Sequence, residues 1–329
     1  MMLRAGIVGC GFMGRMHANV YKIMDDVELV AAVDYHPERL EKFTTEFGLK
    51  GYDSLEAMAE AENLDIIDIC VPTHVHHEYT LRAAKLGKQI FCEKPMARTA
   101  EQAKEMVAAA NEAGVRLMIG HCIRFWPEYA LLKEIVDDQR LGKLLSINLT
   151  RYGGFPAWAS DGWNYDEAKC GGGVLDMHIH DTDFILYLLG EPDSMESTGN
   201  VDEKGPGHVF TTMRYGNTVA HLEGGWNLPT NAPFKMAFRA IFERGCIIMD
   251  ACPMTIFEEG KDPVVPEFEQ MEASGGGNLS SLGGYYHELR YFVDSIKNGT
   301  PLEIVTPETS RQSLEYTLKE IELIKAKIK

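Results

Sequence analysis

Short apolar runs alternate with longer stretches of helical spacing through the first third of the chain. The apolar runs occupy 4–8, 28–33, 65–71, 88–93 and 115–120. The third run, Asp-Ile-Ile-Asp-Ile-Cys-Val, shows little polar alternation, which is typical of a parallel strand buried on both faces. Because strands and helices alternate throughout, we predict a doubly wound parallel sheet.

Turn and capping residues indicate where the intervening helices begin and end. The predicted helices cover 37–47, 54–62, 73–86 and 99–113. Thr99 and Gln102 are spaced as a capping box, and Gly114 follows the last helical residue. A further helix is predicted directly after residue 14.

Past His121 the pattern changes to longer strands joined by tight turns. The predicted strands cover 144–152, 208–215, 218–226, 234–242 and 246–250, and the predicted helices cover 128–136, 173–189, 285–298 and 307–327. Residues 274–284, rich in glycine and serine, are predicted to form a loop. Consecutive strands with short turns imply an antiparallel sheet. We therefore predict an α/β Rossmann domain over residues 1–122 and an α+β domain over 123–329.

A glycine-rich turn, Gly-Cys-Gly-Phe-Met-Gly at 9–14, follows the first apolar run. In a dinucleotide-binding turn, Gly9 allows the tight bend, Gly11 lets the backbone approach a pyrophosphate, and Gly14 lets the helix pack on the strand. The helix N-terminus then offers N–H groups to the phosphates. A glycine turn in another kind of α/β protein is the alternative interpretation.

Asp34 ends the second apolar run, about 20 residues after Gly14. A carboxylate at this position can accept hydrogen bonds from both ribose hydroxyls of an adenosine, and it repels a 2′-phosphate. We therefore predict NAD as the cofactor, with NADP less favoured. Arg39, which follows in the sequence, could weaken this preference for NAD over NADP.

The charge and the cysteines of the chain argue against several classes of protein. A net charge of -17 argues against nucleic-acid binding, which requires a basic face. No segment approaches the length of a membrane span, and the first residues run straight into a strand without room for a signal peptide. The seven cysteines lack C-x-x-C spacing. We predict reduced core cysteines and no structural zinc, in a cytoplasmic protein without membrane partners.

The residues that follow the parallel strands form the candidate cofactor site, because ligands of open parallel sheets bind beyond the carboxyl ends of the strands. The predicted cofactor-binding residues are Gly9, Gly11, Phe12, Met13, Gly14, Asp34, Val71, Pro72, Thr73, His76, Glu93 and Lys94. The Lys94 ammonium could hydrogen-bond a substrate hydroxyl beside the nicotinamide and stabilise developing negative charge. A salt bridge from Lys94 to Glu93 or to another acid is the alternative interpretation.

A histidine-rich helix is the candidate for acid–base chemistry. Helical spacing puts Asp176 and His180 on one face, and Asp183 continues that face. A carboxylate beside an imidazole orients the ring and raises its basicity, as the oxidation of an alcohol requires. His178 falls on another face, which disfavours a metal site built from these four residues. A core histidine with a structural aspartate remains the alternative.

A second histidine-rich segment, Thr-His-Val-His-His at 73–77, follows the third strand. We expect His74 and His76 to line the turn along which the cofactor passes, with zinc binding as a lesser alternative. The rule of strand ends also selects the segment from His121 to Arg124.

These motifs together resemble the Gfo/Idh/MocA family, named in part after glucose–fructose oxidoreductase and inositol dehydrogenase. The resemblance rests on residues 9–14, on Val-Pro-Thr-His-Val-His at 71–76, on Cys-Glu-Lys-Pro at 92–95, on residues 171–183, and on Tyr-Tyr-His-Glu-Leu-Arg-Tyr-Phe at 285–292. It implies an N-terminal Rossmann domain and a C-terminal domain built on a large open antiparallel sheet, which commonly forms the subunit interface.

By this resemblance Lys94, Asp176 and His180 are catalytic, and His180 is the proton-transfer residue. Many members carry tyrosine at the position of His180, so the histidine favours the inositol and polyol branch. The same resemblance makes Asp183 and Tyr286 substrate-binding residues.

One position departs from the family pattern. Asn164 follows Trp163, where many members have Trp-Arg. An arginine contact to the cofactor or substrate is therefore either missing or supplied by Arg124 or Arg151. We include Arg124 among the predicted substrate-binding residues.

The C-terminal strands also predict an assembly. They alternate apolar and polar residues, and one face of such a sheet would expose a broad surface unless another subunit covered it. Large residues of types enriched at interfaces, Met213, Trp226, Met236 and Phe238, lie in these strands. We predict a homodimer or a homotetramer.

These observations predict an NAD-dependent dehydrogenase that transfers hydride between nicotinamide and a secondary alcohol of a cyclic polyol or sugar, most specifically an inositol 2-dehydrogenase. Two alternatives stay open. One is an oxidoreductase that acts on an aldose, a deoxysugar, a nucleotide sugar or a dihydrodiol. The other is a non-catalytic NAD-binding regulator, which would not need Lys94, Asp176 and His180 together.

Overall fold

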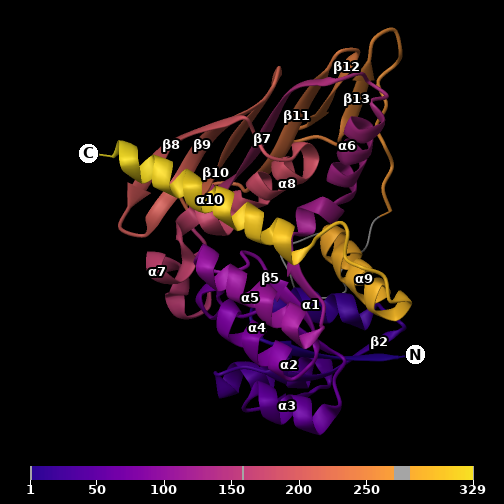
Figure 1. Cartoon of the computed structure of the whole chain (residues 1–329), viewed down its shortest axis with the longest axis vertical. Coiled ribbons are helices and arrows are strands. Elements are labelled where there is room, and N and C mark those ends of the chain that lie inside the picture. Colours follow the sequence, from indigo (N-terminus) through magenta and orange to yellow (C-terminus); the bar gives the residue numbers. More distant parts are fainter. Residues whose placement is uncertain (1, 158, 270–281, 329) are drawn as a thin grey trace. The chain divides into compact units, whose positions relative to one another are not determined.

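The computed structural model describes residues 2–157, 159–269 and 282–328, which form two compact units (Figure 1). Among these residues the first unit comprises 2–125 and 282–311, and the second comprises 126–269 and 312–328. The division expected from the sequence, at residue 122, assigns residues 282–311 to the second domain. The packing of this segment places it in the first unit.

The first unit contains a six-stranded parallel sheet in the order β3-β2-β1-β4-β5-β6. Its elements are β1 (Leu3–Val8), α1 (Phe12–Lys22), β2 (Val27–Val33), α2 (Pro37–Phe47), β3 (Lys50–Tyr52), α3 (Leu55–Glu62), β4 (Ile66–Ile69), η1 (Thr73–Val75), α4 (His76–Lys85), β5 (Gln89–Glu93), α5 (Ala100–Ala113), β6 (Leu117–Gly120), η2 (Cys122–Phe125) and α9 (Gly283–Asn298). The strand order reverses between β1 and β4, where doubly wound sheets bind dinucleotides. The predicted doubly wound sheet is confirmed.

Two local features of the first unit differ from the prediction. The helix expected from Thr73 is a 3-10 turn as far as Val75, and α4 begins at His76. Such turns are common at helix N-termini because they satisfy backbone groups over a tighter bend. The strand β3 was not predicted, because three residues at a sheet edge are too few to show a period.

The helix α9 completes the core of the first unit, although it lies near the end of the chain. Apolar side chains from α9 pack with those of β1, α1 and β5 in one buried cluster. The rings of Phe91 and Phe292 meet edge to face, with centroids 5.6 Å apart. The C-terminal segment therefore contributes to the interior of the Rossmann sheet's unit.

The second unit contains a seven-stranded sheet in the order β13-β12-β11-β7-β10-β9-β8. Its strands are β7 (Leu144–Gly154), β8 (Ser194–Asp202), β9 (Gly205–Tyr215), β10 (Thr218–Leu228), β11 (Lys235–Phe242), β12 (Gly245–Met249) and β13 (Thr255–Glu258). Its helical segments are α6 (Pro127–Asp138), η3 (Ser160–Tyr165), α7 (Glu167–Cys170), η4 (Val174–His178), α8 (Ile179–Leu189) and the part of α10 (Pro307–Lys327) from Gln312 onward. Figure 1 shows α8 and α10 beside the strands of this sheet.

The predicted antiparallel second sheet is confirmed except at one pair of strands, β7 and β10, which run parallel. The edge strands β8 and β13 were not predicted. The segment of β8, Ser-Met-Glu-Ser-Thr-Gly-Asn-Val-Asp, has no apolar run, and it takes its extended form by pairing with β9. Most of the predicted loop, residues 274–281, lies outside the described residues.

Three of the four large side chains expected at a subunit interface lie in the unit's own core instead, whereas Met236 is half-buried. Met213, Trp226 and Phe238 are all buried. Strand residues alternate between the two faces, and these three occupy buried positions. Within the described ranges, no helix is long and apolar enough to cross a membrane.

Candidate active site

The glycine turn after β1 has the backbone geometry that a dinucleotide site requires. Gly9 has a φ of +103°, in the region that favours glycine, and a Cβ there would lie 2.6 Å from the Cys70 carbonyl oxygen. A Cβ on Gly14 would lie 2.1 Å from the Gly9 carbonyl oxygen, so α1 packs against the turn only with glycine. At Gly11 a Cβ would meet no atom within 4 Å, which leaves the backbone open to a pyrophosphate.

Asp34 is held beside this turn by backbone and side-chain donors. Its Oδ2 accepts a hydrogen bond from the Cys10 N–H at 2.8 Å, and its Oδ1 accepts one from the His36 N–H at 2.9 Å. Arg39 Nε lies 3.0 Å from both carboxylate oxygens. The arginine carbon Cζ lies 5.3 Å from the centroid of the Tyr35 ring. A cation therefore adjoins the carboxylate that is predicted to select NAD.

The residues after β4 and β5 are tied together by His76. Its Nδ1 lies 2.8 Å from the Pro95 carbonyl oxygen, and its Nε2 lies 2.8 Å from the Val71 carbonyl oxygen. Burial lowers the pKa of His76, and a neutral ring can donate to only one of the two carbonyls. His76 thus links two strand-end segments, while His74 is exposed.

Lys94 directly follows β5 and is half-buried. Its backbone N–H donates to Oε2 of the buried Glu93 at 3.1 Å. Glu93 and Lys94 are therefore joined by a hydrogen bond from the Lys94 main chain. This places Lys94 at the carboxyl edge of the sheet whose first turn is the glycine turn.

In the second unit, a glycine run lets the candidate acid–base segment approach β9 closely. A Cβ on Gly172 would lie 2.5 Å from the Pro206 carbonyl oxygen, and one on Gly173 would lie 2.6 Å from the Gly207 carbonyl oxygen. The next five residues, η4, form a π-helical turn that leads into α8. Such turns are frequent at functional sites.

Asp176 and His180 are half-buried on this segment, whereas His178 is fully buried. His178 Nε2 lies 3.1 Å from Glu320 Oε1, and Thr182 Oγ1 donates to Glu320 Oε2 at 2.8 Å. These buried contacts join the segment to α10. His178 therefore has a different environment from Asp176 and His180, as the helical spacing suggested.

Asp183 is buried, whereas Asp176 and His180 are partly accessible. It is 1% exposed, and its Oδ1 accepts a hydrogen bond from Ser313 Oγ at 2.7 Å. The π-helical turn shifts the helical phase, so the simple three- and four-residue spacing does not describe this segment. A substrate contact by Asp183 stays a prediction.

The two arginines considered for the missing Trp-Arg contact are both buried and bonded. Arg124 Nη1 donates to the Ile304 carbonyl oxygen at 2.6 Å. Arg151 Nη2 forms an ion pair with Asp181 at 3.1 Å. Tyr286, on α9, packs partly against the core of the first unit.

The predicted site residues fall into two groups. Lys94, Arg124, Tyr286 and the predicted cofactor-binding residues belong to the first unit, and Asp176, His180 and Asp183 belong to the second. Within the first unit the fold brings the glycine turn, Asp34 and the segments after β4 and β5 to the carboxyl edge of one sheet.

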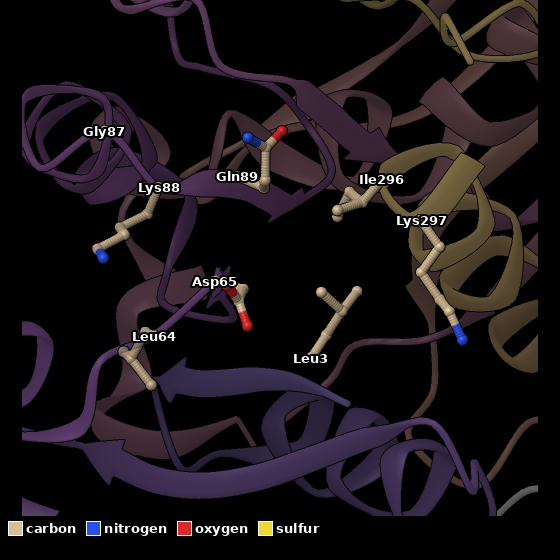
Figure 2. Close-up of a pocket in the computed structure, with 8 residues that line it drawn as sticks. All are labelled: Leu3, Leu64, Asp65, Gly87, Lys88, Gln89, Ile296 and Lys297. Carbon is tan, nitrogen blue, oxygen red and sulfur yellow. The ribbon is translucent and has the colours of Figure 1, made fainter. Parts of the chain in front are cut away.

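A hollow of about 370 Å³ opens at the opposite edge of this sheet. Its lining residues come from the amino ends of β1, β4 and β5 and from α9 (Figure 2). These residues are Leu3, Leu64, Asp65, Gly87, Lys88, Gln89, Ile296 and Lys297. None of them is a predicted site residue, and ligands of doubly wound sheets bind at the carboxyl edge. The hollow is therefore not the candidate active site.

Sequence reasoning missed a buried polar cluster that includes His17 and Glu288. His17 lies on the buried side of α1, between Met16 and Val20, and Glu288 lies on the buried side of α9. The available signal was a polar residue at a position where the helical period requires an apolar one. That signal does not identify the partners, which come from distant parts of the chain.

Comparison with known proteins assigns both parts of the chain to one family. The family model described as the Gfo/Idh/MocA oxidoreductase family, NAD-binding Rossmann fold, matches residues 3–121. The model of the Gfo/Idh/MocA C-terminal domain matches residues 129–248.

Two curated relatives have different activities. The 2,7-anhydro-N-acetylneuraminate hydratase of Escherichia coli K12 is 30% identical over 68% of this chain and 62% of its own length. The inositol 2-dehydrogenase of Rhizobium meliloti is 33% identical over 61% of this chain and 59% of its own length. The matched region thus spans about three fifths of these relatives.

A solved structure agrees in fold. A levoglucosan dehydrogenase in complex with NADH and levoglucosan superposes with a TM-score of 0.85 over 99% of this chain and 98% of its own, at 22% sequence identity. At that identity the likeness shows the shared fold.

Proposed function

Because the chain belongs to the Gfo/Idh/MocA family of oxidoreductases, we propose that it is an NAD-dependent dehydrogenase of a ring secondary alcohol in a cyclic polyol or sugar. The specific activity that we propose is that of an inositol 2-dehydrogenase. The observation that carries the proposal is the position of Lys94, at the carboxyl edge of the same sheet as the open glycine turn.

In the proposed reaction, His180 accepts the proton of the substrate hydroxyl, and Asp176 orients the imidazole. Lys94 donates a hydrogen bond to the reacting oxygen and stabilises the negative charge that develops there. NAD, when bound, accepts the hydride. Arg124, Asp183 and Tyr286 are proposed to contact the remaining hydroxyls of the substrate. Asp34 is proposed to make NAD preferred over NADP.

The test is a panel of polyols and sugars assayed with NAD by the appearance of NADH absorbance. The panel includes myo-inositol, levoglucosan, free aldoses, nucleotide sugars and a trans-dihydrodiol. The highest kcat/KM is expected for myo-inositol. A higher value for another compound would replace inositol as substrate, and NAD binding without turnover of any compound would support a regulator instead.

A second candidate is a hydratase of an anhydro sugar, since a relative at 30% identity has that name. Such a reaction causes no net change in NADH, so it would be invisible in the absorbance assay. Chromatography of 2,7-anhydro-N-acetylneuraminate after incubation with the enzyme and NAD would detect it. A hydrated product without NADH accumulation would favour this candidate.

We also propose that the chain forms a homodimer or homotetramer through one face of the second sheet. This face exposes Phe210, Ile241 and Phe257, which are 43%, 39% and 38% accessible. Ile241 and Phe257 share one face, since both pair with Cys246. Phe210 lies on the same face, since its row of partners, Glu223 and then Thr150, leads to Ala237, an even number of residues before Ile241 on β11. A cytoplasmic location stays a prediction from the reduced cysteines.

A further inference from the structure

A chain of three charged side chains lies buried in the first unit. Asp68 on β4 lies 2.9 Å from His17 Nδ1, and Glu93 Oε1 lies 3.1 Å from His17 Nε2. The second contact has ion-pair distance without hydrogen-bond alignment. We call Asp68, His17 and Glu93 the buried charge chain. None of its members is more than 4% exposed.

Asp68 makes the largest contribution to the charge of the ring. Burial alone lowers the pKa of His17, but the charge of Asp68 and its hydrogen bond outweigh burial and hold the pKa well above its usual range. Burial likewise raises the pKa of Glu93, and the contacts with His17 and the charge of Lys94 bring it below its usual range. The buried charge chain therefore consists of an imidazolium between two carboxylates.

Glu288 on α9 lies beside the buried charge chain. Its carboxyl group, one ring nitrogen of His17 and the Glu93 carboxylate lie within 4.8 Å of one another. Neither Glu288 oxygen has a hydrogen-bond partner among the described residues. Burial, and then the charge of Glu93, raises the pKa of Glu288 well above its usual range. Because its carboxyl group is neutral, Glu288 can lie beside the Glu93 carboxylate without electrostatic repulsion.

The remaining polar groups around the ring are neutral. Cys70 Sγ lies 3.2 Å from His17 Nδ1, and burial raises the pKa of this thiol. Burial also raises the pKa of the Tyr21 phenol on the same helix. On its other side, the His17 ring meets Phe91 edge to face. Asp68 and Glu93 are therefore the anions that face the imidazolium.

The buried charge chain ends at the backbone of the proposed catalytic lysine. Glu93 Oε2 accepts the Lys94 N–H at 3.1 Å, while Oε1 of the same carboxylate faces His17. A carboxylate held at both oxygens cannot rotate freely, so the peptide it binds has a fixed orientation. The direction in which the Lys94 side chain leaves the sheet edge depends on that peptide.

We propose that His17 and Glu93 are positioning residues that orient Lys94 from inside the protein, through the contacts of the Glu93 carboxylate with the Lys94 N–H and the His17 ring. The inference rests on the proposed role of Lys94. It predicts an unequal response to two chemically equal substitutions. Glu93→Gln removes one of the two negative charges that face His17. Glu288→Gln replaces a neutral acid with a neutral amide of similar shape.

The first experiment compares Glu93→Gln, His17→Gln and Glu288→Gln in kcat, in KM for the polyol and in the Kd of NADH from its fluorescence. We expect kcat to fall about ten- to a hundredfold in the first two, because a small misplacement of a catalytic group costs rate on that scale. Glu288→Gln should keep kcat within about twofold, and His17→Gln and Glu288→Gln should both bind NADH nearly as tightly as the parent protein. Equal losses in Glu93→Gln and Glu288→Gln, or full kcat in Glu93→Gln, would overturn the positioning role.

The second experiment needs neither turnover nor a variant. NMR of the histidine rings should show His17 protonated at a pH of about 8, where an ordinary histidine with a pKa of about 6.5 is neutral. A neutral ring would overturn the proposed charges, as would a stoichiometric divalent metal found in the purified protein by elemental analysis.

Different results would overturn the proposed function and the positioning role. Unchanged turnover in Lys94→Ala would overturn the role of Lys94 and with it the proposed function, whatever the NMR result. A loss in Lys94→Ala without a loss in Glu93→Gln would overturn only the positioning role.

Discussion

At the scale of single residues, Lys94 carries the proposed chemistry. We expect Lys94→Ala to lower kcat by about a hundredfold or more with the fold intact, because a donor that stabilises developing charge is lost. Lys94→Arg should also have a low kcat, because a planar guanidinium group replaces the compact ammonium group. Steady-state kinetics with circular dichroism as the folding control would check this. Near-normal turnover in Lys94→Ala would contradict the proposed catalytic role of Lys94.

Asp34 and Arg39 together should set the choice of cofactor. In the parent protein the carboxylate repels a 2′-phosphate and also engages Arg39. Asp34→Ser should release the guanidinium for a 2′-phosphate and shift the NADP to NAD ratio of kcat/KM by about ten- to a hundredfold, or about 1.4–2.8 kcal/mol. The matched control, Asp34→Ser with Arg39→Ala, should lose the gain with NADP. A parent enzyme that prefers NADP would contradict the role of Asp34.

Glu288 makes stability depend on pH in a defined direction. Its raised pKa means that the folded protein keeps a proton that the unfolded chain releases above a pH of about 4.3. The folded state then binds more protons than the unfolded state, so this group lowers stability as the pH rises through that value. The other groups of the cluster are present in both proteins, so their contributions largely cancel in a comparison with Glu288→Gln.

We therefore expect Glu288→Gln to melt like the parent at a pH of about 4 and at a higher Tm at a pH of about 8, by about 1–2 °C for each kcal/mol gained. Differential scanning calorimetry at both pH values gives the comparison. A lower Tm for Glu288→Gln at the higher pH would show that the native carboxyl group is ionised.

At the scale of elements, α8 depends on its buried contacts with α10. Glu320 accepts a hydrogen bond from Thr182 and faces the buried ring of His178. Glu320→Ala leaves both groups buried without that partner, so we expect a loss of about 1–3 kcal/mol in the free energy of unfolding. The exposed neighbour Glu322 supplies the control, and Glu322→Ala should change stability by less than about 0.5 kcal/mol. Denaturant titration measures both, and equal effects would contradict the proposed anchoring.

At the scale of the whole molecule, the exposed apolar face of the second sheet should determine the assembly. Phe210→Glu together with Ile241→Lys should convert the proposed oligomer to a monomer, because burying unpaired charges at an interface is costly. Lys42→Glu, on the exposed surface of α2, should leave the mass unchanged. Light scattering after size exclusion reports the mass. A parent protein of 36.8 kDa at micromolar concentration would show that this face needs no partner.

The sequence by itself determined the elements with strong local signals. The glycine turn, the buried parallel strands and the capped helix α5 all follow from turn chemistry and residue period, which act over a few positions. The same signals identified Lys94 and Asp34 as strand-end residues, because strand ends in a parallel sheet share one edge. Weak edge strands such as β8 were missed, since pairing rather than local pattern makes them extended.

Only the tertiary structure decided which distant residues meet. It placed α9 in the first unit, it brought Glu288 to His17 and Glu93, and it buried Asp183 against Ser313. It also showed that a π-helical turn precedes α8, which changes the faces that simple helical spacing assigns. These outcomes depend on packing between segments far apart in the chain, where burial removes water and makes each polar contact depend on its partner.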